Sequence, residues 1–253
     1  MSGLTSAATV SPVKISVVVP AFNEERLLGA SLAQIKSAAE AFTQRRWDWE
    51  LIVCDNNSTD RTAEIAREAG AIVVFEPHNQ IARARNAGAS RACGDWLVFV
   101  DADSQPSRDL FEDVAAEIAG GGCLAGGCTV ALDSDRPAAR FYARLWNALS
   151  RMSKWGAGSF IFCSAALFRE VGGFSRDLYA AEEIDLFRRL KRAAREQGRA
   201  VVILHRHPLA TSDRKIRLYS VTEQLAFLAR TTLSAGRTLR SRSGCYPWYD
   251  GRR

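Results

Sequence analysis

Residues Asp95–Pro106 read DWLVFVDADSQP, an apolar run that ends abruptly on two carboxylates. The run Trp96–Val100 does not alternate with polar residues, which is typical of a strand buried on both faces of a parallel sheet. Asp101 and Asp103 follow where that strand would end. Open α/β sheets bind their ligands at the carboxyl ends of the strands. The segment therefore predicts a parallel sheet with an acidic site at its edge.

Two strands upstream repeat this design. The apolar strand Ile15–Val19 leads into PAFNEE, where Asn23 is expected to cap the next helix. The strand Leu51–Val53 leads into the polar loop Asp55–Asp60. Strand–helix–strand units have right-handed crossovers and place such loops along one edge of the sheet. We therefore expect three polar loops to share one rim.

The other expected elements complete an α/β fold with a Rossmann-like, mainly parallel central sheet flanked by helices. They are helices at 24–41, 61–70, 80–92, 107–118, 137–154, 182–198 and 215–238, a short helix ending at Gly172–Gly173, and strands at 71–75, within GGGCLAGGCTVAL, within GSFIFCS and at 200–204. Ser107 is expected to cap the helix that ends at Ile118.

Composition narrows the class of protein. The chain has 253 residues, of which 47% are apolar and 25% charged, enough for a full globular core. Its apolar runs are far shorter than the roughly 20 residues of a membrane-spanning helix, so we expect none. Residues 1–13 do not resemble a secretory signal and are expected to be a disordered lead-in. The six cysteines show no Cys-x-x-Cys spacing, which favours reduced thiols in a cytosolic protein.

Charge is unevenly distributed along the chain. Residues 1–187 hold 18 Lys and Arg against 24 Asp and Glu, whereas residues 188–253 hold 16 against 4. The basic tail fits contact with anionic lipid or a phosphorylated substrate, and it also fits a merely solvated surface. Nucleic acid is disfavoured as a partner because the tail has neither a zinc motif nor an aromatic-rich platform.

The two strand-end carboxylates suit a divalent cation. Mg²⁺ and Mn²⁺ prefer oxygen ligands and usually complete their coordination with water and substrate phosphates. Asp101 and Asp103 would therefore suffice where a diphosphate supplies the remaining ligands. The tripeptide alone also fits a solvated loop, and its place at a strand end is what favours the metal site.

A second acidic group opens the helix EEIDLFRRLKRAAREQG. At about 100° per residue, Glu183 lies in the middle of the apolar stripe, Glu182 at its margin and Asp185 outside it. We expect Glu183 to be the only one of the three that points at the protein body. A buried acid needs a partner or a function, so Glu183 is a candidate general base. The alternative is that Glu183 caps the first turn.

Basic side chains accompany these acids. Arg83, Arg85 and Asn86 lie on the expected helix before the acidic strand, and arginine suits phosphate because its donors are planar and bidentate. His205 and His207 follow a strand, where alternation lets only one of them reach the rim. Each of these residues also fits a solvated surface or a structural role.

Taken in order, VVVPAFNEE, ELIVCDNNSTDRT, ARARNAGASRACGDWLVFVDADS, GGF and EEIDLFRRL resemble the motifs of family 2 glycosyltransferases with the GT-A fold. The resemblance extends over about Lys14–Arg192. It implies a glycosyltransferase domain at 14–212, with a nucleotide-sugar-binding half at 14–106 and an acceptor and catalytic half at 107–212. An acceptor-side helical region with a basic C-terminal helix and tail would follow at 213–253.

The resemblance also implies roles for individual residues. The nucleotide-sugar would be bound by Pro20, Ala21, Phe22, Glu24, Asp55, Asn56, Arg83, Asp101 and Ala102. A divalent metal, Mn²⁺ or Mg²⁺, would be held by Asp101, Asp103 and His207, or less readily by His205. Glu183 would be the catalytic base, at a position where many relatives have Asp. Asp-Asn-Asn-Ser at Asp55–Ser58 replaces the Asp-Asp-Gly-Ser of many relatives and leaves the preferred nucleotide base open.

The implied reaction transfers a sugar, with inversion, from a nucleotide-diphosphate sugar to an acceptor hydroxyl, and a UDP-sugar is the favoured donor. The acceptor stays open between a glycan, a lipid-linked molecule and a small molecule. The helices at 137–154 and 215–238 are candidates for an acceptor site or a peripheral membrane contact, and the expected location is the cytoplasm, including the inner face of the membrane.

Two other functions remain as alternatives. A non-catalytic sugar-nucleotide-binding module would keep the fold and lack turnover, since a fold does not establish an activity. A nucleotidyltransferase would share the sheet and the acidic site, but it would normally begin with a Gly-rich phosphate loop, which PAFNEE replaces here.

Overall fold

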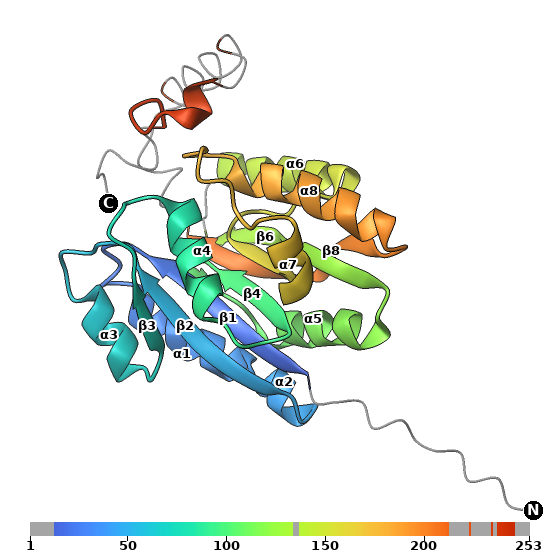
Figure 1. The fold of residues 1–253 in the computed structure, drawn as a ribbon, viewed down its shortest axis with the longest axis horizontal. Helices are drawn as coiled ribbons and strands as arrows, with labels where there is room; N and C mark the ends of the chain where they lie inside the picture. Colours follow the sequence, from blue (N-terminus) through green and yellow to red (C-terminus); the bar gives the residue numbers. More distant parts are fainter. Residues whose placement is uncertain (1–12, 134–136, 213–222, 224–233, 235–236, 246–253) are drawn as a thin grey trace, which may run out of the picture.

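The computed structural model describes residues 13–133, 137–212, 223, 234 and 237–245. An eight-stranded sheet carries helices on both faces (Figure 1). Most of the expected lead-in, and most of the expected basic helix and tail, lie outside the described residues. Within the described ranges, no helix combines the length and the apolar character needed to cross a membrane.

The strand order in the sheet is β3-β2-β1-β4-β7-β6-β8-β5. The strands are β1 (Lys14–Ala21), β2 (Asp48–Asp55), β3 (Ile72–Phe75), β4 (Trp96–Val100), β5 (Ser104–Gln105), β6 (Cys123–Asp133), β7 (Phe160–Ser164) and β8 (Ala200–Ser212). The first four pair in parallel, as their continuous apolar runs predict. β7 runs antiparallel to β4 and to β6, so β7 begins where β4 ends.

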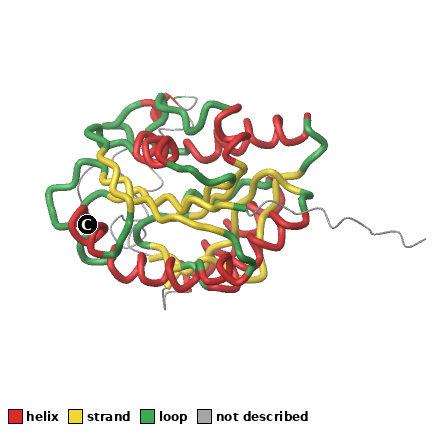
Figure 2. The backbone as a smooth tube through the Cα atoms, turned by 60° about the horizontal axis from the view of Figure 1, so that its bottom comes forward, coloured by secondary structure: helices red, strands yellow, loops and turns green. Residues whose placement is uncertain are grey.

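Helices form the two outer layers, with the strands between them (Figure 2). They are α1 (Leu28–Ala38), α2 (Glu40–Gln44), α3 (Thr62–Glu68), α4 (Ile81–Arg91), α5 (Arg108–Gly120), α6 (Pro137–Ser153), α7 (Ala165–Glu170), α8 (Glu182–Glu196) and the 3-10 helix η1 (Arg237–Arg240). α1, α2, α3 and α5 enclose one core, which contains Phe42 and Phe111. α4, α7 and α8 enclose the core on the opposite face, which contains Phe99 and Phe187.

Two expected helix starts have different outcomes. Ser107 caps α5 as predicted, because its hydroxyl accepts a hydrogen bond from the Leu110 amide at 3.1 Å. The prediction that Asn23 caps α1 is wrong, since α1 begins at Leu28 without a side-chain cap. Asn23 has a left-handed backbone with φ 52°, and its Oδ1 accepts from the Thr59 amide at 2.8 Å. Asn23 thus joins the loop after β1 to the loop after β2.

Helix α4 lies close against β1 because residue 88 has no side chain. A Cβ added at Gly88 would lie 2.5 Å from Cγ1 of Val18, closer than two carbon atoms approach in folded proteins. Since α4 also carries Arg85, this packing sets how far Arg85 stands above the sheet.

Gly88→Ala should force α4 away from β1 and lower the free energy of unfolding by about 1–3 kcal/mol. Urea denaturation followed by circular dichroism measures this loss. The matched control is Gly120→Ala in the last turn of α5, where an added Cβ meets nothing within 4 Å. The control should be neutral or gain up to about 1 kcal/mol. Equal losses in both variants would contradict the close-packing account.

Candidate active site

A buried arginine joins the elements of the candidate site. Arg85 on α4 is 1% exposed, and its Nη2 donates to Oδ1 of Asp101 at 2.9 Å and to the Gly158 carbonyl at 2.7 Å. Its Nη1 donates to Oε1 of Glu182 at 2.7 Å. The guanidinium carbon also lies 5.1 Å from the centre of the Phe174 ring. One side chain thus connects the end of β4, the loop before β7 and the start of α8.

Opposite charges keep this buried guanidinium protonated. Burial alone would lower the pKa of Arg85, whereas the carboxylates of Asp101, Glu182 and Glu183 raise it, and the net direction is upward. A buried ion pair requires well-placed partners, because each charge has lost its hydration. The geometry of these groups is therefore closely tied to the stability of the fold.

Glu183, the predicted base, lies beside the Arg85 contacts in the first turn of α8. The side chain is half-buried, and its Cδ would lie 3.5 Å from a Cβ placed on Gly158. Burial and then the neighbouring charge of Glu182 raise the pKa of Glu183 to about 8. Arg85 opposes this shift only in part, because its Nη atoms are already paired with Asp101 and Glu182. Glu183 can therefore exchange a proton near neutral pH.

The prediction that Glu182 lies at the margin of its helix, and that only Glu183 points at the protein body, is wrong. Glu182 is buried and is the direct partner of Arg85. It is the first residue of α8 and follows Ala181, which has a left-handed φ of 59°. At a helix start the direction of a side chain follows the incoming backbone, so an ideal helical projection misplaces it. The N-cap is Ala181, without a side-chain hydrogen bond, so the alternative that Glu183 is the cap is not seen.

The two strand-end aspartates lie in a turn after β4. The Ser104 amide donates to the Asp101 carbonyl at 3.0 Å, and the Asp101 amide donates to the Ser159 carbonyl at 3.1 Å. Ala102 is buried between Asp101 and Asp103, whose side chains are half-buried. The Asp101 carboxylate is 17% exposed and gives only Oδ1 to Arg85, so its second oxygen can take another ligand.

The residues predicted to line the nucleotide pocket meet where β1 and β2 end. Pro20 and Ala21 are the buried last residues of β1, Phe22 is half-buried, and Glu24 is buried. The Ala21 carbonyl accepts from the Asn56 amide at 2.8 Å, which joins the two strand ends. The backbone of this rim is therefore held in place before any ligand binds.

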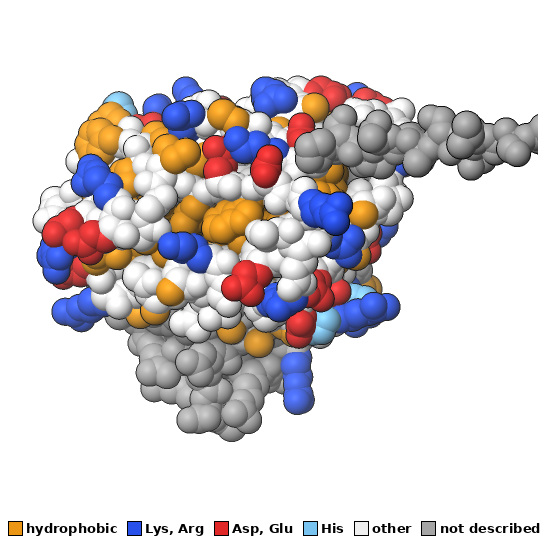
Figure 3. Space-filling model, turned by 90° about the horizontal axis from the view of Figure 1, so that it is seen from below, with side chains coloured by type: hydrophobic (Ala, Val, Ile, Leu, Met, Phe, Trp, Pro, Cys, Tyr) orange, Lys and Arg blue, Asp and Glu red, His pale blue; other side chains and the backbone are white. Residues whose placement is uncertain are grey.

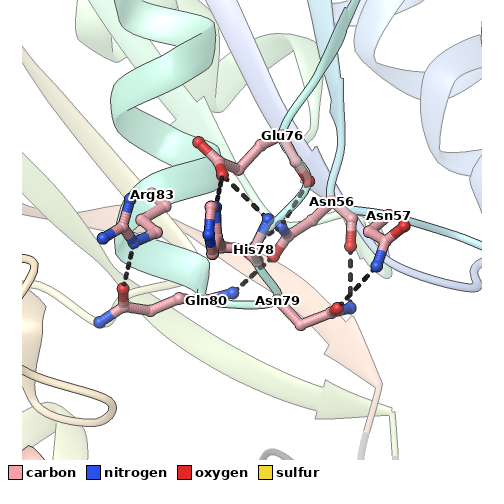
Figure 4. A network of polar contacts seen from close by, with 7 residues as sticks. All are labelled: Asn56, Asn57, Glu76, His78, Asn79, Gln80 and Arg83. Atoms are coloured by element: carbon pink, nitrogen blue, oxygen red, sulfur yellow. Dashed lines mark hydrogen bonds and ion pairs between the residues drawn. The ribbon is translucent and has the colours of Figure 1, made fainter.

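Asn56 uses its side chain within the protein (Figure 4). Its Nδ2 donates to the Glu76 carbonyl at 3.1 Å and to the His78 carbonyl at 2.6 Å. Its Oδ1 accepts from the Gln80 amide at 2.9 Å. These contacts shape the loop 76–80, so the structure places Asn56 as a support of that loop rather than as a free hydrogen-bond acceptor.

Asp55 and Arg83 border the same loop. Asp55 is buried, and its Oδ1 accepts from the Ser58 amide at 3.0 Å. Arg83 is half-buried, and its Nε donates to Oε1 of Gln80 at 3.0 Å (Figure 4). Gln80 in turn donates to two carbonyls of the 176–178 segment. The sequence did not single out Gln80, because a glutamine that bonds to a distant backbone leaves no local pattern.

Asn86 is a second connection between α4 and the loop before α8. Its Nδ2 donates to the Phe174 carbonyl at 2.8 Å, and its Oδ1 accepts from the Phe174 amide at 2.9 Å. Gly173, with φ 67°, lies so close that an added Cβ would be 2.7 Å from Oδ1 of Asn86. The Gly-Gly-Phe motif is thus the docking point for this asparagine.

His207 does not accompany the aspartates of the turn after β4. Its Nδ1 lies 3.0 Å from Oδ2 of Asp113, and its Nε2 lies 4.0 Å from Oδ2 of Asp109, both on α5. His205 is exposed. Among the residues that the structure describes, no three His, Cys, Asp or Glu side chains are grouped to hold a metal. The geometry therefore does not support either histidine as a third ligand, because an irregularity in β8 turns His207 toward α5.

These features define a class of protein. Parallel strands ending in polar loops, an acidic turn after β4 and an acidic helix start joined to it form an α/β architecture similar to the GT-A glycosyltransferases. The chain has this fold. Within the class, the model of the family described as "Glycosyl transferase family 2" matches residues 16–171, and the chain belongs to that family.

Known proteins with this likeness differ in what they bind. S. aureus TarS in complex with UDP-GlcNAc superimposes with a TM-score of 0.62 at 19% identity, covering 88% of this chain and 66% of that one. The mannosyltransferase from Pyrobaculum calidifontis in complex with GDP-Man and Mn²⁺ gives a TM-score of 0.64 at 19% identity, covering 90% and 64%. At these identities the likeness is one of fold.

A relative from Mycobacterium tuberculosis (strain ATCC 25618 / H37Rv) is similar in sequence. This uncharacterized glycosyltransferase is 35% identical over 113 residues, which are 45% of this chain and 47% of the relative. The matched part of the chain thus spans less than half the length of that relative.

Arg85→Met should leave the buried carboxylate of Glu182 and the Asp101 carboxylate without their cation. The free energy of unfolding should fall by about 3–5 kcal/mol, as for other buried ion pairs that lose one partner. Urea denaturation measures this loss. The control is Arg83→Met on the same helix, which should cost only about 0.5 kcal/mol. A loss for Arg85→Met no larger than that of the control would contradict the bridging role.

Glu183→Gln should stabilise the fold increasingly as pH rises. The folded protein raises the pKa of Glu183 from 4.5 to about 8, so ionisation of this group opposes folding. The contribution of Glu183 to the free energy of unfolding is most favourable below pH 4.5 and is lost progressively up to about pH 8. Thermal unfolding should show a clear gain in Tm at pH 8 and little gain at pH 5. Asp185→Asn, which breaks the surface pair with Arg189, is the control and should gain nothing. A gain that shrinks with rising pH would refute this assignment.

Proposed function

We propose that the protein is an inverting glycosyltransferase that moves a sugar from a nucleotide-diphosphate sugar to an acceptor hydroxyl. The observation that carries this proposal is the pair of contacts from Arg85 to Asp101 and Glu182. These contacts hold the acidic turn at Asp101 beside Glu183. The turn suits a divalent cation that would bind a diphosphate, and the Glu183 carboxylate suits proton transfer. Membership of family 2 of the glycosyltransferases supports the same reaction class.

The donor would lie across the ends of β1, β2 and β4. Its base and ribose would rest against Pro20–Glu24 and Asp55, with the diphosphate nearer to Arg83 and the 101–103 turn. Asn56 would support the base pocket through the loop 76–80. The proposed donor is a UDP-sugar, and the presence of UDP-GlcNAc and GDP-Man in the two similar structures supports a nucleotide-diphosphate sugar as the donor class.

A divalent cation, Mn²⁺ or Mg²⁺, fits the carboxylates of Asp101 and Asp103. Such cations need only one or two protein carboxylates when phosphates and water complete the shell. Because Arg85 takes only one oxygen of Asp101, the other supports ligation. The bound metal would supply positive charge for the leaving diphosphate, so no protein acid is required on that side.

Glu183 would accept the proton of the acceptor hydroxyl. The hydroxyl oxygen attacks the anomeric carbon from the face opposite the diphosphate, which inverts the configuration at that carbon. A carboxylate with a pKa of about 8 is a stronger proton acceptor, once ionised, than an ordinary glutamate. Glu182 remains paired with Arg85 and positions the start of α8.

The acceptor is proposed only as a hydroxyl on a glycan, a lipid-linked molecule or a small molecule. The cytoplasm is the proposed location, and the absence of disulfide bonds among the six cysteines, all within the described residues, supports a reducing compartment.

Donor binding should raise the melting temperature, because a ligand that binds only the folded state stabilises it. Thermal unfolding with UDP, GDP, CDP, dTDP and their sugars, each with Mn²⁺, Mg²⁺ or chelator, should give a metal-dependent shift with one nucleotide, expected to be UDP. Asp103→Ala should abolish the shift, and Asp109→Ala on α5 should keep it. No metal-dependent shift with any nucleotide would contradict the donor site.

Turnover should depend on the Glu183 carboxylate. Glu183→Gln should lower kcat by about 10²–10⁴-fold while the donor-induced thermal shift is kept, since the amide cannot take a proton. Asp185→Asn in the same helix turn should retain most activity. Activity should also rise with pH as Glu183 ionises, toward about pH 8. A fully active Glu183→Gln enzyme would exclude this residue as the base.

A further inference from the structure

Helix α6 presents a row of large apolar side chains to solvent. Leu145, Leu149 and Met152 are 60%, 46% and 85% exposed, and Phe75, at 61%, is the other large hydrophobic residue this exposed in the described part of the chain. The three residues follow one another at intervals of four and three, which places them on one side of a helix. Three such residues in a row form a continuous apolar surface, unlike the single exposed residues that are common on proteins.

The opposite side of α6 is fixed to the sheet, so this row points away from the protein. Nδ2 of Asn147 donates to the Val130 carbonyl at 2.8 Å, and its Oδ1 accepts from the Val130 amide at 2.9 Å. Ser150 is fully buried and its hydroxyl donates to the Trp155 carbonyl at 2.6 Å. At 100° per residue, Asn147 and Ser150 lie opposite Leu149 and Met152. The helix is therefore already anchored, and its apolar row is not part of the core.

Positive charge flanks the apolar row. The helix sequence PAARFYARLWNALSRMS contains three arginines and no acid. Arg144 and Arg151 are exposed and seven residues apart, so they lie on the same flank of the helix, and the exposed Lys154 follows directly.

Helix α8 continues this basic surface. Nζ of Lys191 donates to the Ser153 carbonyl at 2.9 Å, which joins α8 to the end of α6, and the two helices lie at the same side of the molecule (Figure 1). Arg188 and Lys191 both lie 5.5 Å from the ring of Trp155, at the junction between the helices. Arg188 and Arg195 are exposed and form no ion pair with a described residue. Burial lowers the pKa of Lys191 most, and the nearby positive charges of Arg188 and Lys154 lower it further, so three cations lie close together at this junction.

The lower face of the molecule is not predominantly basic. There, acidic and basic side chains lie among one another around apolar side chains (Figure 3). A mixed face of this kind has no strong attraction for a charged surface, whereas a face that combines an apolar row with cations does.

We propose that the α6–α8 surface, formed by Leu145, Leu149 and Met152 with Arg144, Arg151, Lys154, Arg188 and Arg195, binds the surface of an anionic phospholipid bilayer. The apolar row would enter the boundary between headgroups and acyl chains, and the arginines and lysine would contact lipid phosphates. An anchored helix with an outward apolar face and a cationic flank has the chemistry of an interfacial membrane helix. A protein partner would be matched to this surface only if it were both acidic and apolar.

The experiment is sedimentation of the full chain with vesicles of phosphatidylcholine mixed with phosphatidylglycerol, compared with vesicles of phosphatidylcholine alone. The wild-type protein should bind the anionic vesicles, and added salt should weaken binding. The variant Leu145→Ser, Leu149→Ser, Met152→Ser should bind about tenfold less or weaker still. Arg144→Gln with Arg151→Gln should lose binding to the anionic vesicles by a similar factor.

The matched control is Phe75→Ser, which removes an equally exposed apolar side chain at the opposite edge of the sheet and should leave binding unchanged. Circular dichroism should show that the triple serine variant stays folded, since its three side chains lie outside the core. The variant keeps residues 213–253, so unchanged binding by it would assign lipid contact to that tail and overturn the proposal. A wild-type dimer that the triple substitution converts to a monomer would show that a second copy covers the face, which also overturns it.

Discussion

The contacts of the buried Arg85 guanidinium are the constraint on which the active-site side of this molecule depends. A charge without water requires opposite charges at close range, and here they come from Asp101 after β4 and Glu182 at the start of α8. The same side chain also fixes the loop before β7 through the Gly158 carbonyl. Elements from the first and second halves of the chain thus cannot move independently without leaving a buried charge unpaired. This coupling is supported by close packing beneath, since α4 rests on β1 through Gly88.

The way in which Arg85 distributes its hydrogen bonds explains why two adjacent glutamates differ. Glu182 and Asp101 accept hydrogen bonds from its two Nη atoms. Burial and the negative charges of these two neighbours therefore raise the pKa of Glu183, and Arg85 offsets that shift only in part. A carboxylate in that position destabilises the fold at neutral pH and gains basicity. Ala181 adds to the local cost, because a left-handed backbone is unfavourable for an alanine. Strained backbone conformations of this kind cluster at active sites and ligand-binding sites.

Sequence patterns predicted what depends on local periodicity and failed where distant groups pair. Continuous apolar runs predicted the parallel strands, and Ser107 predicted the start of α5, because these follow from neighbouring residues. The placement of Glu182 required the backbone turn at Ala181 and a partner on another helix, neither of which has a local signature. Asn56 was correctly expected at the rim, yet its side-chain amide bonds to the loop 76–80, whose position only the fold provides. His207 turns to α5 through an irregularity in β8 that alternation could not reveal.

The reversed direction of β7 has a consequence for both the active site and the α6–α8 surface. Because Val100 pairs with Phe160 in an antiparallel register, the residues that precede β7 meet those that follow β4. Had β7 been parallel, its carboxyl end would have met that turn, and the 154–159 segment would lie at the opposite edge of the sheet. The observed direction instead places the end of α6 only a short segment away from Asp101 and Glu183. If α6 binds a bilayer, the acidic turn and the proposed base would therefore be separated from the membrane by only one loop. A lipid-linked acceptor would present its hydroxyl at that membrane surface.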